Sequence, residues 1–418
     1  MLSVAEAVAR ITGDVHPLGT ERVALLDAPG RVLATDARAG YTLPHRDNSA
    51  MDGYAVRGSE LAGASEAAPR VFRIVETVAA GQFPSRAIGA GEATRIMTGA
   101  PLPDGADTVI RVEDTDGGTT TVRALKDRDV RKNVRPRGED FREGDIVLPA
   151  GEPLGAAQLG VLASLGCAMV DVHRAPRVAI LGSGDELVDL DRFDEVLAGR
   201  KIVASNGYTL HALVRSAGGV PVPIGNAADT PESMRALFER ALATEPDLIV
   251  SSAGISVGEF DYTRDVLGGL GAELKFWKVR MRPGAPIGFG AVHGVPWIGL
   301  PGNPVSVMVT FELFVRPAIR RLLGHTRLHR RAVPVTLEEP VQIGARLTHF
   351  LRAIVTTQPS GELTARLTGP QGSGILTSMA RANALLVVPE DQPAHAAGDR
   401  LSALLLTPDA QLTETFAL

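Results

Sequence analysis

The chain has 418 residues, with 43 Lys and Arg against 48 Asp and Glu, which gives a formal net charge of −5. Its 44% hydrophobic and 22% charged residues are those of an ordinary globular protein and exclude intrinsic disorder. The slightly acidic balance argues against a general nucleic-acid binder. At roughly 150 residues per domain, the length predicts two to four domains.

Cys167 is the only cysteine, so the sequence excludes an intramolecular disulfide and a thiolate metal cluster. A reducing compartment fits this cysteine content. The first residues, MLSVAEAVARITGDV, have no cationic start followed by an apolar core. No apolar run approaches the roughly 20 residues that span a bilayer. We therefore expect a cytoplasmic protein that binds neither nucleic acid nor a membrane.

The first 174 residues predict two kinds of structure. Apolar positions on one helical face follow Ser3, a candidate N-cap, and short strand-like runs come next. From about residue 44 to 146, short β-like runs are separated by Gly and Pro, which is typical of a small β-rich domain. Helical periodicity returns at residues 154–166 and ends at Gly166.

Strands and helices alternate from about residue 175. The runs PRVAILGSGDEL and PDLIVSSAGISVGEFDYT are strands that open into Gly-containing loops, and Ser205 or Asn206 and Thr230 are candidate helix caps. This alternation predicts an open α/β layer with a parallel-rich sheet, whose ligands lie beyond the carboxyl ends of the strands. After Gly324, short strands predict a C-terminal β barrel. The predicted fold class is α/β multidomain with additional β-rich domains.

Two polar stretches of the β-rich part are candidate sites. Residues 44–54, PHRDNSAMDGY, could position a polar heterocycle or a metal ion, although Asx turns and a cap explain them as well. Residues 128–142 are rich in arginine, whose fork matches phosphates and oxyanions, but a solvated charged face is an equal alternative. The cations of this stretch are Arg128, Arg131, Lys132, Arg135, Arg137 and Arg142.

Three loops of the α/β layer are candidate ligand loops. In residues 182–186 and 251–261, small side chains let backbone N–H groups approach phosphates, and Glu186 and Asp261 could hold Mg²⁺. In residues 300–306, Asn303 and Pro304 begin a helix, whose start attracts anions; a well-capped structural helix is the alternative.

Other chemistry finds little support in the sequence. The nine histidines show no metal-ligand spacing, and we expect them on the surface or in turns. There is no GxSxG elbow, and Cys167 lies in apolar company after a helix end, as a buried filler would. The residues alone therefore indicate a phosphate- and metal-handling α/β protein.

Taken together, the motifs resemble those of one family, the molybdopterin molybdenumtransferases, which include the bacterial MoeA proteins and the E domain of gephyrin. The matching stretches run from about residue 44 to 389. They are DNSAMDGYAV, RIMTGAPLPDGADTVI, NVRPRGEDFREGD, ILGSGDEL, SNGYTL, SSAGISVGEFDYT, FWKVRMRPGAPIGFG, GLPGNPVS and GPQGSGILTSMARANALLVVP.

The resemblance implies a four-domain subunit and a homodimer. Domain I would comprise residues 1–43 and 147–174, domain II 44–146, domain III 175–325 and domain IV 326–418. Domain III would resemble molybdopterin adenylyltransferase, and domain IV would be a small β barrel. The implied reaction inserts molybdate into adenylylated molybdopterin with Mg²⁺-dependent hydrolysis that releases AMP. An upstream adenylyltransferase and downstream molybdoenzymes are the implied protein partners.

The family's site residues are carried over position by position. The implied catalytic residues are Asp52, Thr98, Asp140, Glu186, Asp229 and Asp261, of which Glu186, Asp229 and Asp261 would hold Mg²⁺. Asp52 and Thr98 would complete the site of the other subunit. The implied residues for the adenylylated pterin are Ser183, Gly184, Ser252, Gly254, Ser256, Gly258, Pro301, Gly302, Asn303 and Pro304. The implied molybdate pocket contains Arg282, Arg352 and Ser373.

Two positions depart from the family pattern. Many members carry a second Lys where this chain has Ala285, which bears on the choice between molybdate and tungstate. Ala253 replaces a glycine, and its methyl group would crowd a phosphate unless its φ is negative.

Three alternatives remain beside the molybdate insertase. They are a tungstate-selective insertase, a molybdopterin adenylyltransferase and a non-catalytic scaffold. The β-rich domains argue against a lone adenylyltransferase, and the six retained acidic and polar positions argue against a scaffold.

Overall fold

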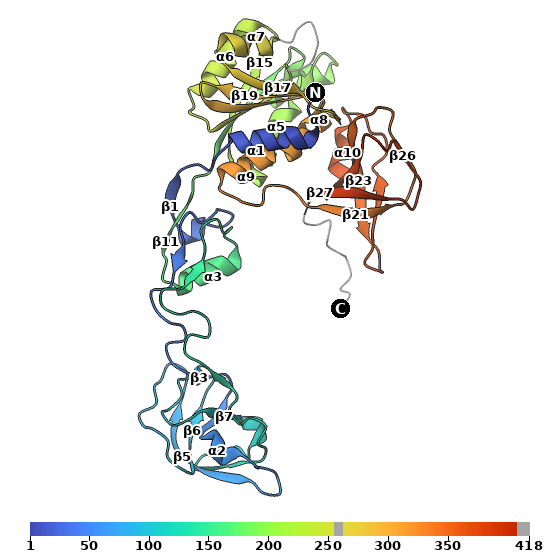
Figure 1. The fold of residues 1–418 in the computed structure, drawn as a ribbon. Coiled ribbons are helices and arrows are strands. Elements are labelled where there is room, and N and C mark those ends of the chain that lie inside the picture. Colours follow the sequence, from blue (N-terminus) through green and yellow to red (C-terminus); the bar gives the residue numbers. More distant parts are fainter. Residues whose placement is uncertain (255–261, 408–418) are drawn as a thin grey trace. The chain divides into compact units, whose positions relative to one another are not determined.

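The computed structural model describes residues 1–254 and 262–407. By its internal contacts the chain divides into two units (Figure 1). Unit 1 contains residues 1–35, 151–156 and 169–418, and unit 2 contains residues 36–150 and 157–168. The division into four domains stays a prediction.

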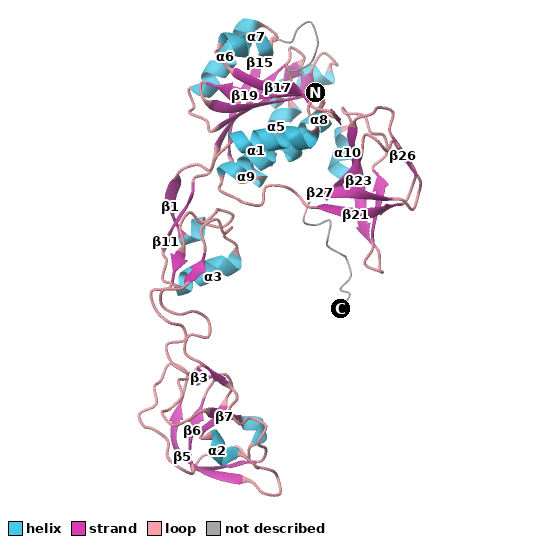
Figure 2. Ribbon diagram, viewed as in Figure 1, coloured by secondary structure: helices cyan, strands magenta, loops and turns pink. Residues whose placement is uncertain are grey.

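Unit 2 consists mainly of short strands, as its Gly- and Pro-punctuated sequence predicts (Figure 2). Its five-stranded sheet has the order β7-β4-β6-β5-β8, in which β5 and β6 are parallel and the other pairs antiparallel. Buried Tyr54, Phe72 and Ile110 form its core. The strands are β2 (Ala37–Arg38), β3 (Asn48–Ser49), β4 (Gly53–Val56), β5 (Arg70–Val78), β6 (Glu92–Ile96), β7 (Thr108–Arg111), β8 (Thr121–Ala124), β9 (Val134–Arg135) and β10 (Ile146–Leu148). The helices are α2 (Gly58–Leu61), η2 (Val112–Asp114) and α3 (Ala156–Ser164), which confirms the helix predicted before Gly166.

The centre of unit 1 is a six-stranded sheet of order β15-β12-β16-β20-β19-β17. Strands β15, β12, β16 and β20 are parallel, and β19 pairs antiparallel with both β20 and β17, so the predicted parallel-rich α/β layer is confirmed. The strands are β12 (Arg177–Ser183), β15 (Val220–Ala227), β16 (Leu248–Ser252), β17 (Glu273–Lys278), β19 (Pro286–Val292) and β20 (Val295–Leu300).

Helices cover both faces of this sheet because side chains alternate along each strand. Val178 and Ile180 of β12 pack in the same cluster as α5 (Ser205–Ser216), whereas Ala179 and Leu181 pack with α6 (Pro231–Leu242). The remaining helices of this region are α7 (Thr263–Gly269), η3 (Leu190–Arg192) and α4 (Phe193–Leu197), and β13 (Leu187–Val188) and β14 (Ile202–Val203) pair as a separate two-stranded sheet.

The predicted helix caps have mixed outcomes. The Thr230 side chain accepts a hydrogen bond from the Ser233 N–H, as an N-cap should. Ser3 caps α1 (Val4–Asp14) in the same way. The expectation that Ser205 or Asn206 caps α5 is wrong, because the helix begins at Ser205 and Ala204 occupies the N-cap position.

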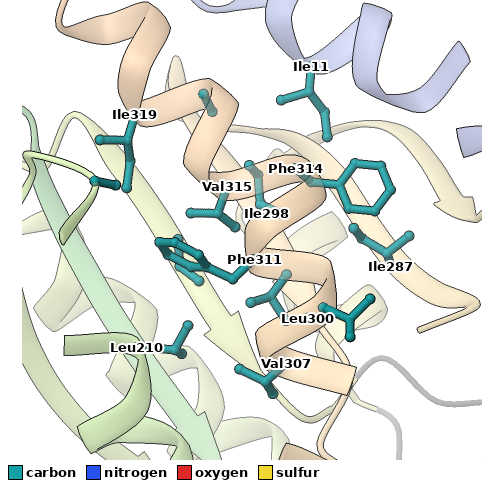
Figure 3. Packing of buried hydrophobic residues seen from close by; sticks show 14 of the residues in the cluster. Ile11, Leu210, Ile287, Ile298, Leu300, Val307, Phe311, Phe314, Val315 and Ile319 are labelled. Atoms are coloured by element: carbon teal, nitrogen blue, oxygen red, sulfur yellow. The ribbon is translucent and has the colours of Figure 1, made fainter. Parts of the chain in front are cut away.

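A buried helical run crosses unit 1 from α8 (Pro304–Thr310) through η4 (Phe311–Val315) to α9 (Arg316–Leu322). Pro317 lacks an N–H and crowds the preceding turn, and η4 is a π-helical segment in which the Arg316 N–H donates to the Phe311 carbonyl. Figure 3 shows Phe311 and Phe314 packed among apolar side chains of the sheet and α1. The N-terminal helix therefore contributes to this core.

The last part of unit 1 confirms the predicted β barrel. Strands pair in the order β23-β24-β21-β27-β25, and β25 returns to β23 to close the barrel. Strand β18 pairs with β23 and links the barrel to the α/β layer. The elements are β18 (Met281–Arg282), β21 (Ala332–Leu337), β22 (Val341–Gln342), β23 (Thr348–Thr357), β24 (Leu363–Leu367), α10 (Leu376–Arg381), β25 (Ala384–Val388), β26 (Ala394–His395) and β27 (Arg400–Leu405).

A short two-stranded ribbon completes unit 1. It pairs β1 (Thr20–Ala24) antiparallel with β11 (Met169–His173), and η1 (Leu25–Asp27) follows β1. Among the helices that the structure describes, none is long and apolar enough to cross a membrane.

Candidate functional site

A cavity of about 360 Å³ lies at the carboxyl ends of β12 and β16, where ligands of open α/β sheets bind. We call it the sheet-edge cavity. Its walls come from the loops after these strands, the start of α5 and the loop between β20 and α8. The lining includes the predicted residues Ser183, Glu186, Ser252, Gly254, Pro301, Gly302, Asn303 and Pro304. Residues that the sequence analysis singled out in separate loops, more than 100 positions apart, therefore lie together at one cavity.

The predicted Gly184 supports the cavity by making room for Glu186. A Cβ added at position 184 would lie 2.6 Å from Oε2 and 2.8 Å from Oε1 of the Glu186 carboxylate. Glycine therefore allows this carboxylate to lie against the backbone of its own loop, beside the cavity that it lines.

The predicted acid Asp229 lies in a different arrangement. Its carboxylate accepts the Asp185 backbone N–H at 3.3 Å, and the Asp185 carboxylate accepts the Asp229 N–H at 3.1 Å. These two contacts hold the loops after β12 and β15 together. Asp229 is not among the described residues that line the sheet-edge cavity. The predicted residues Ser256, Gly258 and Asp261 lie outside the described residues.

The sequence did not identify Asn206 as a site residue. Its Nδ2 donates to the Gly302 carbonyl at 2.7 Å, which joins the start of α5 to the loop before α8. Its Oδ1 is buried and has no hydrogen-bond partner within the described part of the chain. Asn206 also lines the sheet-edge cavity, so this unused acceptor belongs to a residue of that wall.

Ala253 has φ of +72°, in the left-handed region that is unfavourable for an L-residue. A Cβ added at Gly302 would lie 3.2 Å from the Ala253 Cβ, so this methyl group faces the loop before α8. Ala253 therefore lacks the negative φ that would keep its methyl group from crowding a phosphate. The methyl group narrows the sheet-edge cavity between two of its loops.

A second cavity of about 810 Å³ adjoins the barrel, and we call it the barrel-side cavity. Its lining contains all three predicted oxyanion residues, Arg282, Arg352 and Ser373, together with Ala285. Pro286, Pro301 and Asn303 line both cavities. The two cavities therefore share a wall.

Asn303 links the parts of unit 1 at this wall. It occupies the N-cap position of α8, but its side chain does not cap the helix. Instead, Asn303 Nδ2 donates to Ser373 Oγ at 3.0 Å, and the Ser373 carbonyl accepts the Val305 N–H at 3.1 Å. The cap expected from the sequence is thus replaced by a tie to the barrel.

Arg352 is fully buried, and it holds the loop that carries Ser373. Its guanidinium donates to the carbonyls of Pro370, Gln371 and Gly372 at 2.9–3.2 Å and to Ser378 Oγ at 3.0 Å. Burial lowers the pKa of Arg352. No carboxylate pairs with it within the described residues, so a cationic group without a counterion lies beside the cavity. The sequence placed Arg352 here but did not show that most of its donors are occupied.

His349 also lines the barrel-side cavity, and the expectation of surface or turn histidines is wrong for it. Its side chain is buried, and it is the Cα partner of Arg282 between the parallel strands β18 and β23. His325, next to α9, is a second buried histidine. The sequence gave no ligand spacing for either, because strand pairing and long-range packing create their surroundings.

The predicted residues of unit 2 form a small hydrogen-bonded site. Asp52 Oδ1 accepts the N–H and the hydroxyl of Thr98, both at 2.7 Å. The Thr98 backbone hydrogen bond is the main cause that lowers the pKa of Asp52. The Asp140 N–H donates to the Leu43 carbonyl at 3.1 Å. Asp52 and Thr98 are thus in contact, and their shared role in the reaction stays a prediction.

The basic stretch of unit 2 is partly structural. The Arg128 guanidinium binds the buried Asp114 carboxylate at 2.8 Å, so this residue has a structural partner that neither the phosphate site nor the solvated charged face predicted. Arg135 lies on β9, which pairs with the Asn48 strand. Cys167, expected as a buried filler, is half-buried.

The oxygen donors at the sheet-edge cavity fit a magnesium ion. Mg²⁺ in enzymes of phosphate chemistry is typically held by one or two carboxylates, with waters and substrate phosphates completing the shell. Glu186 supplies one carboxylate, and Ser183, Asn226 and Ser252 supply neutral oxygens. Within the described residues, no group of three or more His, Cys, Asp or Glu side chains forms a dedicated metal cage.

Comparison with family models covers most of the chain. Residues 2–166 match the MoeA N-terminal region, described as domain I and II, and residues 179–321 match a probable molybdopterin binding domain. Residues 334–406 match the MoeA C-terminal region, described as domain IV. The three models follow one another in chain order, as the motifs did.

Similar proteins carry matching names. A molybdopterin molybdenumtransferase from Nostoc sp. is 38% identical, over 88% of this chain and 85% of that protein. A molybdopterin molybdenumtransferase 2 from Mycobacterium tuberculosis is 39% identical, over 92% and 95%. The crystal structure of molybdopterin biosynthesis moeA protein from Pyrococcus horikoshii superposes with a TM-score of 0.84 at 28% identity and covers 97% of this chain and 100% of that one. The chain therefore belongs to the molybdopterin molybdenumtransferases, a family of transferases of molybdenum cofactor biosynthesis.

Proposed function

We propose that this enzyme inserts molybdate into adenylylated molybdopterin and hydrolyses the adenylate, with Mg²⁺ as the cation and AMP as the released product. The observation that carries the proposal is the wall shared by the two cavities at Pro286, Pro301 and Asn303. A two-part substrate whose phosphate lies on one side of this wall can place its dithiolene end near an oxyanion on the other. Both reaction partners are then held in one unit of the chain.

In this proposal the sheet-edge cavity binds the adenylate and its phosphates. The small residues Ser183, Ser252 and Gly254 let backbone groups approach a phosphate closely. Glu186, with Asp261 and Asp229 as further predicted donors, would hold Mg²⁺, which neutralises charge on a scissile phosphate when bound. Asn206 Oδ1, an acceptor without a partner in the described residues, would receive an N–H or O–H of the substrate.

The barrel-side cavity would bind the oxyanion. Arg282 and Arg352 contribute positive charge, and among the described residues its lining contains no carboxylate. Anions are favoured in such a cavity because the arginine charge is not neutralised locally. Ser373 would add a hydroxyl donor, held in place by Asn303 and by the Arg352-bound loop.

We further propose a cytoplasmic homodimer in which the Asp52–Thr98 pair serves the partner subunit's reaction. An adenylyltransferase would supply the substrate, and molybdoenzymes would receive the product. Mixing a D52N subunit with an E186Q subunit tests this arrangement. Recovery of activity in the mixed dimer supports the arrangement. If the two inactive variants remain inactive when mixed, the arrangement is contradicted.

The function itself is tested by two variants with opposite defects. E186Q should lose Mg²⁺-dependent AMP release, by about 100-fold or more if the carboxylate positions the metal, and should still bind molybdate. R282A should bind molybdate weakly and still bind adenylylated molybdopterin. E195Q is the matched control for E186Q, because Glu195 lies on the exposed helix α4 and forms an ion pair with Arg192 outside the cavity lining. If either variant lost affinity for molybdate and for adenylylated molybdopterin to the same extent, the two-cavity assignment would be contradicted.

Two other results would redirect the proposal. Stronger stimulation by tungstate than by molybdate would make the enzyme a tungstate-selective insertase. Consumption of ATP with release of pyrophosphate would make it an adenylyltransferase.

A further inference from the structure

His349 is a buried titratable group at the barrel-side cavity that the proposed reaction leaves without a role. Its side chain is 5% exposed and lines the barrel-side cavity, and its Nε2 has no hydrogen-bond partner among the described residues. A buried polar atom without a partner is costly, and such atoms are uncommon in folded proteins. The cost is removed if a ligand of the cavity supplies the partner.

The surroundings of His349 indicate the charge of that ligand. Arg282 is its Cα partner on β18, and Arg352 lies three residues further along its own strand. On the other side, β25 places the apolar Val388 opposite it. Glu390 follows β25, but its carboxylate binds Arg280 at 3.4 Å. The charged side chains that line the cavity are therefore positive, Arg282 and Arg352.

From this arrangement we propose that His349 is a proton-accepting oxyanion ligand: it is neutral in the empty cavity and takes up one solvent proton when a tetrahedral dianion binds between it and Arg282. The inference rests on the proposed role of the barrel-side cavity. Protonation makes both ring nitrogens donors, whichever tautomer the neutral ring has, so Nε2 gains an acceptor in the oxyanion. Binding thus adds one positive group to the pocket only when the negative charge is present.

The electrostatic direction agrees with this geometry. Burial, and then the neighbouring Arg282, lower the pKa of His349 below its ordinary value, while the backbone of Ala345 acts in the opposite sense. A bound dianion acts in the opposite direction, because its negative charge stabilises the protonated ring and offsets the charge of Arg282. Proton uptake and oxyanion binding are therefore linked, and affinity rises as the pH falls between the lower pKa of the empty state and the higher pKa of the bound state.

The experiment is calorimetric titration of the purified full chain with sodium molybdate, in buffers of different ionisation enthalpy. The wild type should take up close to one proton per molybdate near neutral pH, with an affinity that increases up to tenfold for each unit of pH decrease. H349Q should still bind, several-fold more weakly at low pH, with the pH slope and the proton uptake lost. H16Q, which changes an exposed histidine, should behave as the wild type. Protonation of molybdate itself is common to all three proteins and cancels in the comparison.

The outcomes separate the two claims. If R282A weakens molybdate binding but H349Q takes up the same number of protons as the wild type, the role of His349 is overturned and the oxyanion cavity is supported. Binding that neither R282A nor H349Q changes overturns both. Loss of the proton uptake in H349Q, with an unchanged unfolding midpoint, supports the proposal over a purely structural role.

Discussion

Asn303 Nδ2 donates a hydrogen bond to Ser373 Oγ at 3.0 Å, and this contact lies at the wall between the sheet-edge and barrel-side cavities. Asn303 belongs to the loop before α8, and Ser373 belongs to the loop that Arg352 holds. The contact therefore joins the side that would bind the adenylate to the side that would bind the oxyanion.

If this hydrogen bond transmits oxyanion binding to the adenylate, N303A and S373A should each reduce the stimulation of AMP release by molybdate. The double variant should be little worse than either single variant, with an interaction term above about 0.5 kcal/mol in the double-mutant cycle. Rates with and without molybdate give this term. S360A, in an exposed turn of the barrel, is the control. Independent, additive effects would show that the contact is only structural.

Arg352 and Arg282 should respond differently to truncation. R352A removes donors from three carbonyls and a hydroxyl, and it should lower the free energy of unfolding by about 3 kcal/mol or more. R282A should leave the unfolding midpoint unchanged and weaken oxyanion binding, because Arg282 is exposed. Denaturant unfolding and molybdate titration of both variants check this. An unchanged midpoint for R352A would contradict the structural role.

These two arginines show where the sequence was informative and where it was not. The family motifs assigned both arginines to one pocket, and both line the barrel-side cavity. The strand runs predicted Ser183 and Ser252 at strand ends, and both line the sheet-edge cavity, because local patterns record strands and their ends. The occupied donors of Arg352 and the burial of His349 depend on chain segments that come close only after folding. Asn303 shows the same limit: its place at a helix start was predictable, whereas its bond to a residue 70 positions away was not.

Ala253 should tolerate glycine unusually well. Its φ of +72° costs an L-residue roughly 1 kcal/mol, and A253G removes this cost, so the free energy of unfolding should stay equal or increase. A236G is the matched control, because Ala236 is exposed in the interior of α6 and glycine there should destabilise by about 0.5–1 kcal/mol. Denaturant unfolding of both variants compares them. A clear loss of stability in A253G would show that the methyl contact beside Gly302 outweighs the backbone strain.

His325 should make stability depend on pH. Burial, with Arg320 and Arg316 nearby, lowers the pKa of His325 to about 4. Between the ordinary value of about 6.5 and this lower pKa, the unfolded chain binds a proton that the folded chain does not. Stability therefore increases with pH in this window and is lost on acidification, by at most about 1.4 kcal/mol per pH unit. Unfolding midpoints at pH 7, 6 and 5 should fall more steeply for the wild type than for H325Q; equal slopes would contradict the assignment.

The most direct test of the central claim is AMP release from adenylylated molybdopterin by the purified protein, with and without Mg²⁺ and with molybdate or tungstate added. We expect AMP release that requires Mg²⁺, increases with molybdate and leaves molybdenum on the pterin. E186Q should abolish this release, and E195Q should retain it. Tight binding of the adenylylated pterin without AMP release under any of these conditions would contradict this expectation and would leave a non-catalytic scaffold.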